Sequence, residues 1–286
     1  MNKIGETELI LTKEKKIYHL NLKKEEIGDT IILVGDPSRV KMVSNKFDEI
    51  QCKITHREFT THTGKLRNKK ISVISTGIGT DNIDIVVNEL DALVNIDFKN
   101  RQVNKIKRKL NIIRLGTSGA IQKNIKVNSI IASEYALGFD NLAYFYEKKD
   151  ILIQEISKAY ISHTKWPIKL SKPYVVKSSN LLLNKFPLIK KGITATAPGF
   201  YAPQGRKLRL STSIKNLQQK MEQFNFNGNQ ITNFEMECSA LYYLGRSLGH
   251  HTLTICTVLA NRLSNSYSKE PNNAIKNMID YVVDRI

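Results

Sequence analysis

Residues 30–39, TIILVGDPSR, decide the fold, because they place a strand directly before a tight turn and the start of a helix. The first five residues are apolar or β-branched, a composition that favours a buried strand. The turn Gly-Asp-Pro-Ser follows, and residues 40–47 then have the composition of a helix. A strand, a turn and a helix in this order form the repeating unit of α/β proteins.

The same pattern recurs along the chain. Strands are expected at residues 71–75 before Thr-Gly-Ile-Gly, at 111–115 before Gly-Thr-Ser-Gly, and at 251–259. Helices are expected at residues 83–93 and 236–248. Several buried strands that each end in a small-residue turn predict an α/β fold with a mainly parallel or mixed sheet. The loops at its carboxyl edge are the expected place for ligands.

Length and composition are typical of one large domain, residues 1–286. The chain is 41% apolar and contains no Pro/Gly/Ser-rich linker. Its N-terminus lacks the apolar segment of a secretory signal, and its apolar runs are too short to cross a bilayer, so we expect a soluble cytoplasmic protein without a membrane partner. Cys52, Cys238 and Cys256 are expected to be reduced and buried, and no metal-ligand spacing is present.

The net charge of +18 and the pI near 9.7 raise the possibility of nucleic-acid binding. The basic residues are mostly scattered lysines, and KIKRK at residues 105–109 is their only run. Such a run is more often a solvated loop than a binding patch. We therefore expect no nucleic-acid partner. The alternative outside the enzymes is a basic nucleic-acid-binding protein on an inactive enzyme scaffold.

Two strand ends carry an arginine beside small residues. Gly35 and Arg39 follow the first strand, and Arg114 precedes Thr117 and Ser118 near the end of another. Each alone reads as an ordinary turn with a surface arginine. Guanidinium groups bind pairs of phosphate oxygens, so two such loops on one edge of a sheet indicate an oxyanion site.

The motifs GDPSRV, HREFTT, STGIG, IRLGTSGAIQ, FYAPQGR, FEMECSAL and ANR together resemble the ordered motif set of uridine phosphorylases, in the nucleoside phosphorylase family. The resemblance runs from His19 to Arg262. It implies a single-domain three-layer sandwich with a mixed central β-sheet between helices. It also implies a pentosyltransferase of nucleoside salvage that converts uridine and inorganic phosphate, its co-substrate, to uracil and ribose 1-phosphate. The expected assembly is a homodimer or hexamer with sites shared between subunits.

The resemblance also implies the roles of individual residues. Phosphate would be held by Gly35, Arg39, Arg114 and Thr117, with Arg57 from the neighbouring subunit. Ribose would be held by Ser118, Met236 and Glu237, with His19 from the neighbouring subunit. The base would contact Phe200, Gln204, Arg206 and Arg262, and catalysis would rest on Gln204, Arg206 and Glu237. Without the family resemblance, His19 would be interpreted as a structural histidine, Arg57 as a charge at a strand edge and Glu235 as a charge at the start of a helix.

These residue types suit the chemistry. A carboxylate such as Glu237 can accept hydrogen bonds from both vicinal ribose hydroxyls, and an amide and a guanidinium at Gln204 and Arg206 match the edge of a pyrimidine. Related purine nucleoside phosphorylases carry Ser-Asp where this chain has Leu259-Ala260, and their aspartate protonates the purine. A purine or broad-specificity phosphorylase is thus the nearer alternative. A nucleosidase that uses water would leave the phosphate-binding arginines without a task.

Three segments depart from the pattern of the resemblance. Thr80-Asp81-Asn82 replaces a loop tied to a monovalent-cation site at the dimer interface, which puts cation dependence in doubt. An extra segment within residues 94–110 is expected to form a surface hairpin or an oligomer contact. The stretch 144–179 is also long, and it could reshape access to the base pocket.

Overall fold

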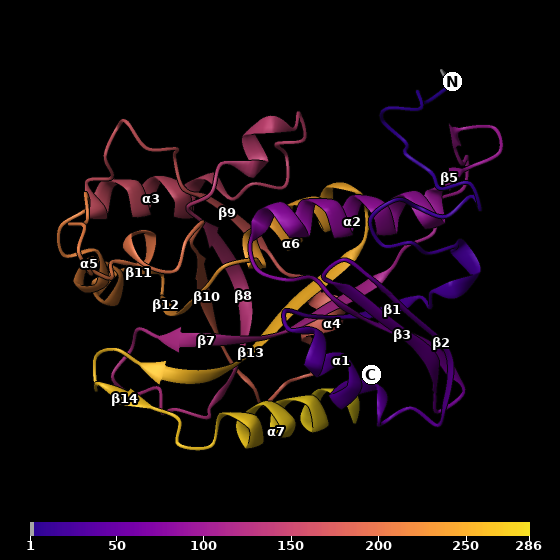
Figure 1. Cartoon of the computed structure of the whole chain (residues 1–286). Coiled ribbons are helices and arrows are strands. Elements are labelled where there is room, and N and C mark those ends of the chain that lie inside the picture. Colours follow the sequence, from indigo (N-terminus) through magenta and orange to yellow (C-terminus); the bar gives the residue numbers. More distant parts are fainter. Residues whose placement is uncertain (1–2) are drawn as a thin grey trace.

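The computed structural model describes residues 3–286 as strands and helices that alternate along much of the chain (Figure 1). The strands are β1 (Thr30–Val34), β2 (Glu49–His56), β3 (Phe59–Leu66), β4 (Lys69–Ser75), β5 (Ile96–Asp97), β6 (Gln102–Val103), β7 (Asn111–Ala120), β8 (Ile130–Gly138), β9 (Tyr174–Lys177), β10 (Lys190–Thr196), β11 (Asn225–Phe226), β12 (Asn229–Glu235), β13 (His251–Asn261) and β14 (Ser266–Tyr267). The helices are α1 (Pro37–Ser44), α2 (Thr80–Asn95), α3 (Gln154–Thr164), α4 (Asn180–Leu183), α5 (Leu217–Gln223), α6 (Cys238–Ser247) and α7 (Pro271–Val283), with 3-10 turns η1 (Lys24–Glu26), η2 (Leu142–Phe145) and η3 (Ala202–Gln204).

One large mixed sheet forms the centre of the described residues. Its strand order is β11-β12-β10-β8-β13-β7-β1-β4-β3-β2, with β9 and β14 added beside β8 and β13. Strand β1 lies parallel to both β4 and β7, and β7 lies parallel to β13. Strands β8 and β13 run antiparallel, which makes the sheet mixed. The carboxyl ends of β1, β4, β7 and β13 therefore meet at one edge.

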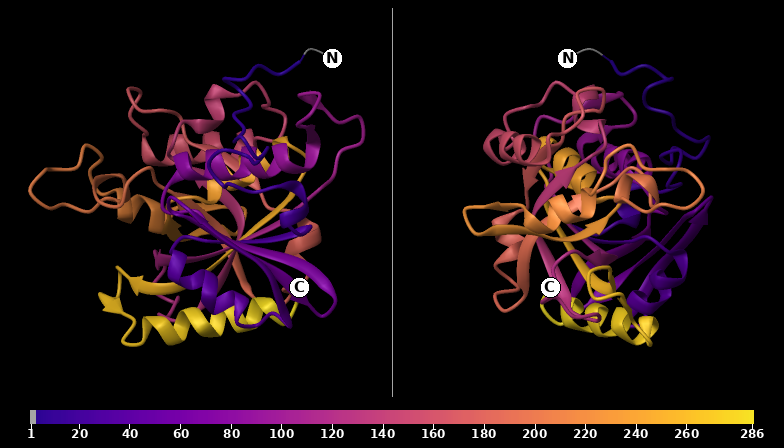
Figure 2. Two further views of the ribbon diagram at one scale, coloured as in Figure 1. Left: turned by 45° about the vertical axis from the view of Figure 1, so that its right-hand side comes forward. Right: turned by 90° about the vertical axis from the view of Figure 1, so that its left-hand side faces the viewer.

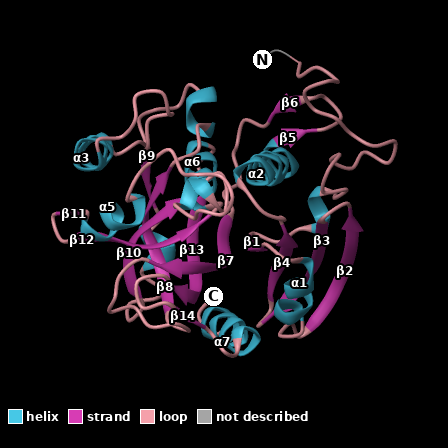
Figure 3. Cartoon of the chain, turned by 60° about the vertical axis from the view of Figure 1, so that its left-hand side comes forward, coloured by secondary structure: helices cyan, strands magenta, loops and turns pink. Residues whose placement is uncertain are grey.

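Helices cover both faces of the sheet (Figures 1 and 3). Strand β1 shows why, since its side chains alternate between the two faces. Ile31 and Leu33 pack into a core shared with α2 and α6, whereas Ile32 and Val34 pack into a core shared with α1 and α7. A third apolar cluster joins α3 and α5 to β8, β10 and β12. The predicted three-layer sandwich with a mixed sheet is confirmed.

Several element boundaries differ from those predicted, and three of them affect residues near the carboxyl edge of the sheet. Gly116-Thr117-Ser118-Gly119 does not form a turn after a strand but continues β7, because both β13 and β12 pair with it. Helix α1 begins at Pro37, so Arg39 lies in its first turn. Helix α6 begins only at Cys238, because Glu235 still pairs with β10 at the end of β12.

The extra segment at residues 94–110 forms a small hairpin, which is one of the two alternatives predicted for it. Strands β5 and β6 pair antiparallel, and Figure 2 shows this segment beside the N-terminal part of the chain. The amide of Ile4 donates to the carbonyl of Arg101 at 2.8 Å, which ties the two segments together. The basic run that follows is exposed except at Arg108, whose Nε pairs with Asp29.

All three cysteines are free, but Cys52 is half-buried rather than buried, because it lies on β2 at the edge of the sheet. Within residues 3–286, no helix combines the length and apolar character needed to span a bilayer. The same residues bring together no cluster of three or more His, Cys, Asp or Glu side chains suited to a metal ion.

Candidate active site

A pocket of about 610 Å³ opens at the carboxyl edge of the sheet. Its walls come from the segments after β1, β4 and β10, from the second half of β7, and from the ends of β12 and β13. These segments are far apart in sequence, and the parallel strands bring their ends together. The pocket has the size of a site for a small molecule such as a nucleoside.

Ten of the thirteen predicted site residues line this pocket: Gly35, Arg39, Arg114, Thr117, Ser118, Phe200, Gln204, Arg206, Met236 and Glu237. Arg262 contacts the backbone of the loop that forms one wall. His19 and Arg57 do not line the pocket. The structure thus assembles ten of the predicted residues around one cavity, places Arg262 behind its wall and leaves His19 and Arg57 away from it.

Arg114 is buried in the middle of the sheet, where an unpaired charge would be costly. Its side chain lies on the same face of β7 as Gly116, two residues further on. A Cβ atom at Gly116 would overlap Nη1 of Arg114 and would come within 2.9 Å of Sγ of Cys256. The glycine therefore leaves the space that the guanidinium occupies.

Glu237 supplies the charge that balances Arg114. Its Oε2 accepts a hydrogen bond from Nη2 of Arg114, and its Oε1 accepts one from the amide of Gly79 at 2.9 Å. Burial alone would lower the pKa of Arg114, but the neighbouring carboxylates outweigh burial and raise it. Nε and Nη1 of Arg114 have no hydrogen-bond partner among the described residues. Nη1 lies 3.6 Å from Oε2 of Glu235, so Arg114 faces two carboxylates at the pocket wall.

Glu235 is a third charged member of this cluster, and its side chain is only 1% exposed. Its carboxylate accepts hydrogen bonds from the amide of Glu237 at 2.8 Å, the amide of Cys238 at 2.9 Å and the hydroxyl of Thr196 at 2.6 Å. Burial raises the pKa of Glu235 to about 7, and the nearby Glu237 carboxylate adds to this rise. Glu235 thus holds the turn that leads into α6 and presents Glu237.

Arg39 reaches the pocket from the first turn of α1. Asp36 caps this helix by accepting a hydrogen bond from the amide of Ser38 at 2.8 Å, and Pro37 occupies the first helical position. The same hydrogen bond lowers the pKa of Asp36. Burial lowers the pKa of Arg39, and the nearby Arg114 contributes to this shift. Two like charges so close together favour an anionic ligand between them.

The predicted base-binding residues gather in the loop that contains η3. The guanidinium carbon of Arg206 lies 3.8 Å from the centre of the Phe200 ring, and Nη1 of Arg206 donates to Oε1 of Gln204. Gln204 is buried, whereas half of the Phe200 surface is exposed. Nη1 of Arg262 donates to the carbonyl of Gln204, so a residue beyond β13 holds this loop in place. Burial lowers the pKa of Arg206, and the nearby Arg262 adds to the effect.

His19 and Arg57 lie together on another part of the surface. Nη2 of Arg57 donates to the hydroxyl of Tyr18 at 3.3 Å, and Nδ1 of His56 lies 2.9 Å from the carbonyl oxygen of His19. The ring of His19 contacts Glu89 on α2 at 2.6 Å. The two residues that the sequence resemblance assigns to a neighbouring subunit are thus adjacent to each other in one copy of the chain.

Sequence reasoning missed several residues of the pocket wall. Ile78, Phe234 and Tyr267 line the cavity, and Glu235 is a buried strand end rather than a charge at a helix start. Ile78 belongs to the STGIG motif, so its place after a strand was a usable signal. Tyr267 reaches the pocket because β14 folds back and pairs with Ala260 of β13, which no sequence pattern indicated.

Comparisons with known proteins agree with this geometry. A family model described as the phosphorylase superfamily matches residues 29–284. The chain is 30% identical over 261 residues to a uridine phosphorylase from Thermococcus kodakarensis, a match that covers 90% of this chain and 82% of the relative. It is also 26% identical to a DeoD-type purine nucleoside phosphorylase from Bacillus cereus, over 93% of this chain and 97% of that protein.

A similar solved structure is that of a Trypanosoma brucei nucleoside phosphorylase, described as showing uridine phosphorylase activity. It superposes with a TM-score of 0.88 at 27% identity, over 97% of this chain and 98% of that one. The strand order, the pocket at the carboxyl edge and the match over nearly the whole chain therefore lead to one conclusion. This chain belongs to the phosphorylase superfamily, as a nucleoside phosphorylase of the uridine phosphorylase type.

Proposed function

We propose that the chain catalyses the reversible phosphorolysis of uridine to uracil and ribose 1-phosphate, a reaction of nucleoside salvage. One observation carries the proposal: a single pocket joins the Arg114–Glu237 pair to the cluster of Phe200, Gln204 and Arg206. The first group suits phosphate and ribose, and the second suits a pyrimidine. The whole chain would act as one cytoplasmic domain.

In this proposal phosphate binds between the guanidinium groups of Arg39 and Arg114, with Gly35 and Thr117 close by. Support comes from the position of both arginines in the pocket wall, where Arg114 is buried and Arg39 is partly buried. Charge-assisted hydrogen bonds in a partly desolvated pocket are stronger than in water. Phosphate is then a co-substrate, and the proposal needs no resident metal or organic cofactor.

Ribose would lie over Glu237 and Met236, with the hydroxyl of Ser118 nearby. The Oγ atom of Ser118 is buried without a hydrogen-bond partner among the described residues, which supports a ligand contact there. The Glu237 carboxylate is already aligned by Arg114 and the Gly79 amide. Such prior alignment lowers the cost of fixing the two vicinal hydroxyls.

The reaction would proceed by cleavage of the C1′–N1 bond, whose electron pair moves into the uracil ring. Arg206 and Gln204 would stabilise the negative charge that gathers on the base. A phosphate oxygen would form the new bond to C1′ from the opposite face, and uracil would take a proton from solvent. Positioning and electrostatics therefore account for most of the rate enhancement.

We further propose that a second copy of the chain completes each site. His19 and Arg57 lie outside the pocket but adjacent to each other, so one surface could deliver both to a neighbouring subunit. Most homodimers have twofold symmetry, and a twofold interface would complete two sites at once. Thr80-Asp81-Asn82 forms the first turn of α2, and the proposal does not require a monovalent cation there.

The proposed preference for a pyrimidine base distinguishes this chain from a purine phosphorylase. Leu259 and Ala260 line the pocket, and neither can protonate a purine. Initial rates with uridine, thymidine and inosine at saturating phosphate test this, alongside an Ala260→Asp variant. We expect uridine to exceed inosine in the wild type and the variant to gain inosine cleavage. A wild type that prefers inosine would overturn the pyrimidine assignment.

A further inference from the structure

A second pocket of about 360 Å³ lies on the other side of the base-binding loop. Its apolar lining includes Phe139, Trp166, Leu170, Pro198 and Ile214, and Ala202 and Pro203 of η3 form part of its wall. No lining residue is shared with the active-site pocket. The long stretch at residues 144–179 supplies Trp166 and Leu170, so this segment builds the second cavity.

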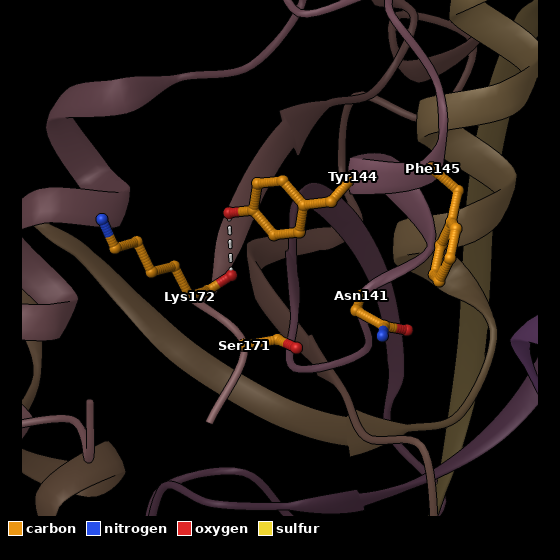
Figure 4. A pocket seen from close by; sticks show the side chains of 5 residues that line it. All are labelled: Asn141, Tyr144, Phe145, Ser171 and Lys172. Atoms are coloured by element: carbon orange, nitrogen blue, oxygen red, sulfur yellow. Dashed lines mark hydrogen bonds between the residues drawn. The ribbon is translucent and has the colours of Figure 1, made fainter. Parts of the chain in front are cut away.

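The second pocket adjoins a more open hollow, shown in Figure 4, because Asn141 and Ser171 line both. The hydroxyl of Tyr144 donates to the carbonyl of Lys172 at 2.9 Å and holds the wall of the hollow. Phe145 also lines the hollow and is 78% exposed. The two cavities therefore adjoin. Aromatic residues line both of them, and the polar residues Asn141 and Ser171 lie where they meet.

The aromatic wall of the second pocket is held by ring packing and by a hydrogen bond. The ring of Trp166 packs against Phe139 with 5.0 Å between centroids, and it also packs against Tyr160. Nε1 of Trp166 donates to the carbonyl of Ser171 at 3.0 Å, which fixes the orientation of the indole. A planar ring that enters the pocket would therefore meet an aromatic surface already held in place.

The polar groups of the pocket favour a neutral ligand. Asn141, Ser171 and Ser213 are exposed polar residues of the lining, and their amide and hydroxyl groups can donate and accept hydrogen bonds. Among the described residues that line this pocket, Asp140 is the only one with a charged side chain. Its carboxylate already accepts hydrogen bonds from the Ser239 hydroxyl and the Tyr174 hydroxyl, and burial raises its pKa.

We propose that the second pocket binds a neutral, planar heterocycle with amide-type donors and acceptors, the class that includes pyrimidine bases. Ala202 and Pro203 directly precede Gln204 in the loop that contains η3. A ligand that contacts these two residues would therefore change the position of the base-binding residues in the same loop. Occupancy of the second pocket therefore changes the KM for the nucleoside. The inference goes beyond the proposed function, because it concerns a separate site.

Trp166 makes this pocket directly observable, since it is the single tryptophan of the chain. The experiment is a titration of the full-length protein with uracil, with Trp166 fluorescence as the signal. Wild type and Arg206→Ala are compared, because the latter weakens the active site and leaves the second pocket intact. Binding is read without turnover, so the result is independent of whether the protein cleaves uridine.

A charge placed in the pocket wall provides the specific test. Ile214→Lys should weaken the fluorescence response about tenfold or more, because a lysine there would need desolvation. Ile168→Lys is the matched control, since Ile168 is fully exposed and does not line the pocket. Circular dichroism checks folding, and Ser213→Phe fills the same pocket if Ile214→Lys does not fold.

We expect a saturable fluorescence change in the wild type, in Arg206→Ala and in Ile168→Lys. The same change should be weaker in Ile214→Lys. Uracil should then also shift the KM for uridine in Ile168→Lys more than in Ile214→Lys. A response that disappears in Arg206→Ala and persists in Ile214→Lys would mean that uracil binds only in the active site. That outcome, or no response up to about 10 mM uracil, would overturn the proposal.

Discussion

The central carbon of the Arg206 guanidinium lies over the Phe200 ring, 3.8 Å from the ring centroid. Nη1 of the same arginine donates to the carbonyl of Phe200 at 2.6 Å and to the side-chain oxygen of Gln204. The cation that would stabilise the departing base is therefore held by the two other residues proposed to bind that base. These contacts within the loop hold Arg206 in this position.

Loss of this cation should affect the chemical step. Arg206→Ala removes the charge proposed to stabilise the leaving base, so we expect kcat for uridine to fall about 10²-fold or more. Steady-state kinetics with uridine and phosphate measure the effect. Arg209→Ala is the matched control, because Arg209 is exposed in the same loop and does not line the pocket. Equal losses in both variants would argue against a specific role for Arg206.

Glu235 should make the stability of the protein depend on pH. Its pKa is raised from 4.5 to about 7 in the folded protein. Between these two pH values the folded state therefore keeps a proton on Glu235 that the unfolded state has released. The free energy of unfolding contributed by this group is thus highest below pH 4.5 and falls as the pH rises through 7. The change is on the order of 3 kcal/mol.

Chemical denaturation at several pH values between 5 and 8 tests this dependence. Glu235→Gln should remove most of the fall in the free energy of unfolding, because the amide does not titrate. Glu155→Gln on the exposed face of α3 should leave the pH dependence as it is in the wild type. A pH profile that is unchanged in Glu235→Gln would contradict the assigned pKa shift.

Gly116 should be required for the position of Arg114. In Gly116→Ala the new Cβ overlaps the guanidinium of Arg114, so the side chain must move from its place at the proposed phosphate site. We expect the KM for phosphate to rise about tenfold and the stability to fall by about 1–3 kcal/mol. Kinetics at varied phosphate and thermal unfolding measure the two effects.

The control for this substitution is Gly5→Ala, because an added Cβ there would lie 3.8 Å from the nearest side-chain atom and the backbone permits alanine. This variant should match the wild type in both measurements. If Gly116→Ala retained the wild-type KM for phosphate, Arg114 would have no part in holding phosphate, and the assignment of the oxyanion site would need revision.

Mixed subunits should restore activity if the site is shared. Arg39→Ala damages the pocket itself, and Arg57→Ala damages the residue proposed to come from the other subunit. A mixed dimer of the two contains one site with both arginines intact. Random mixing of the inactive variants should thus recover about a quarter of the wild-type activity. Each variant alone is the control, and the absence of recovery would place Arg57 outside the neighbouring site.

Much of the fold was predictable because the buried strands are short apolar runs that end in small residues. Strand β1 matches its predicted bounds, and the alternation of Ile31 and Ile32 between two cores follows from strand geometry. The end of β7 was not predictable in the same way. Gly-Thr-Ser-Gly has the composition of a turn, and only pairing with β13 and β12 extends the strand through it.

The candidate site was predictable where a motif carried the residues. FEMECSAL identified Glu237, but no pattern indicated that Glu235 would be fully enclosed by amides and the Thr196 hydroxyl. The amides come from the start of α6 and the hydroxyl comes from β10, so the contact with Thr196 is a property of the tertiary structure. The second pocket was hidden for the same reason, because Phe139, Trp166 and Ile214 have no regular spacing in sequence.

The most direct test of the central claim is the release of uracil from uridine by the purified protein, measured with and without inorganic phosphate. The account predicts turnover that requires phosphate and yields uracil and ribose 1-phosphate in equal amounts. Uracil release at the same rate without phosphate would identify a hydrolase and contradict the account, because the arginines that line the pocket would then hold no co-substrate.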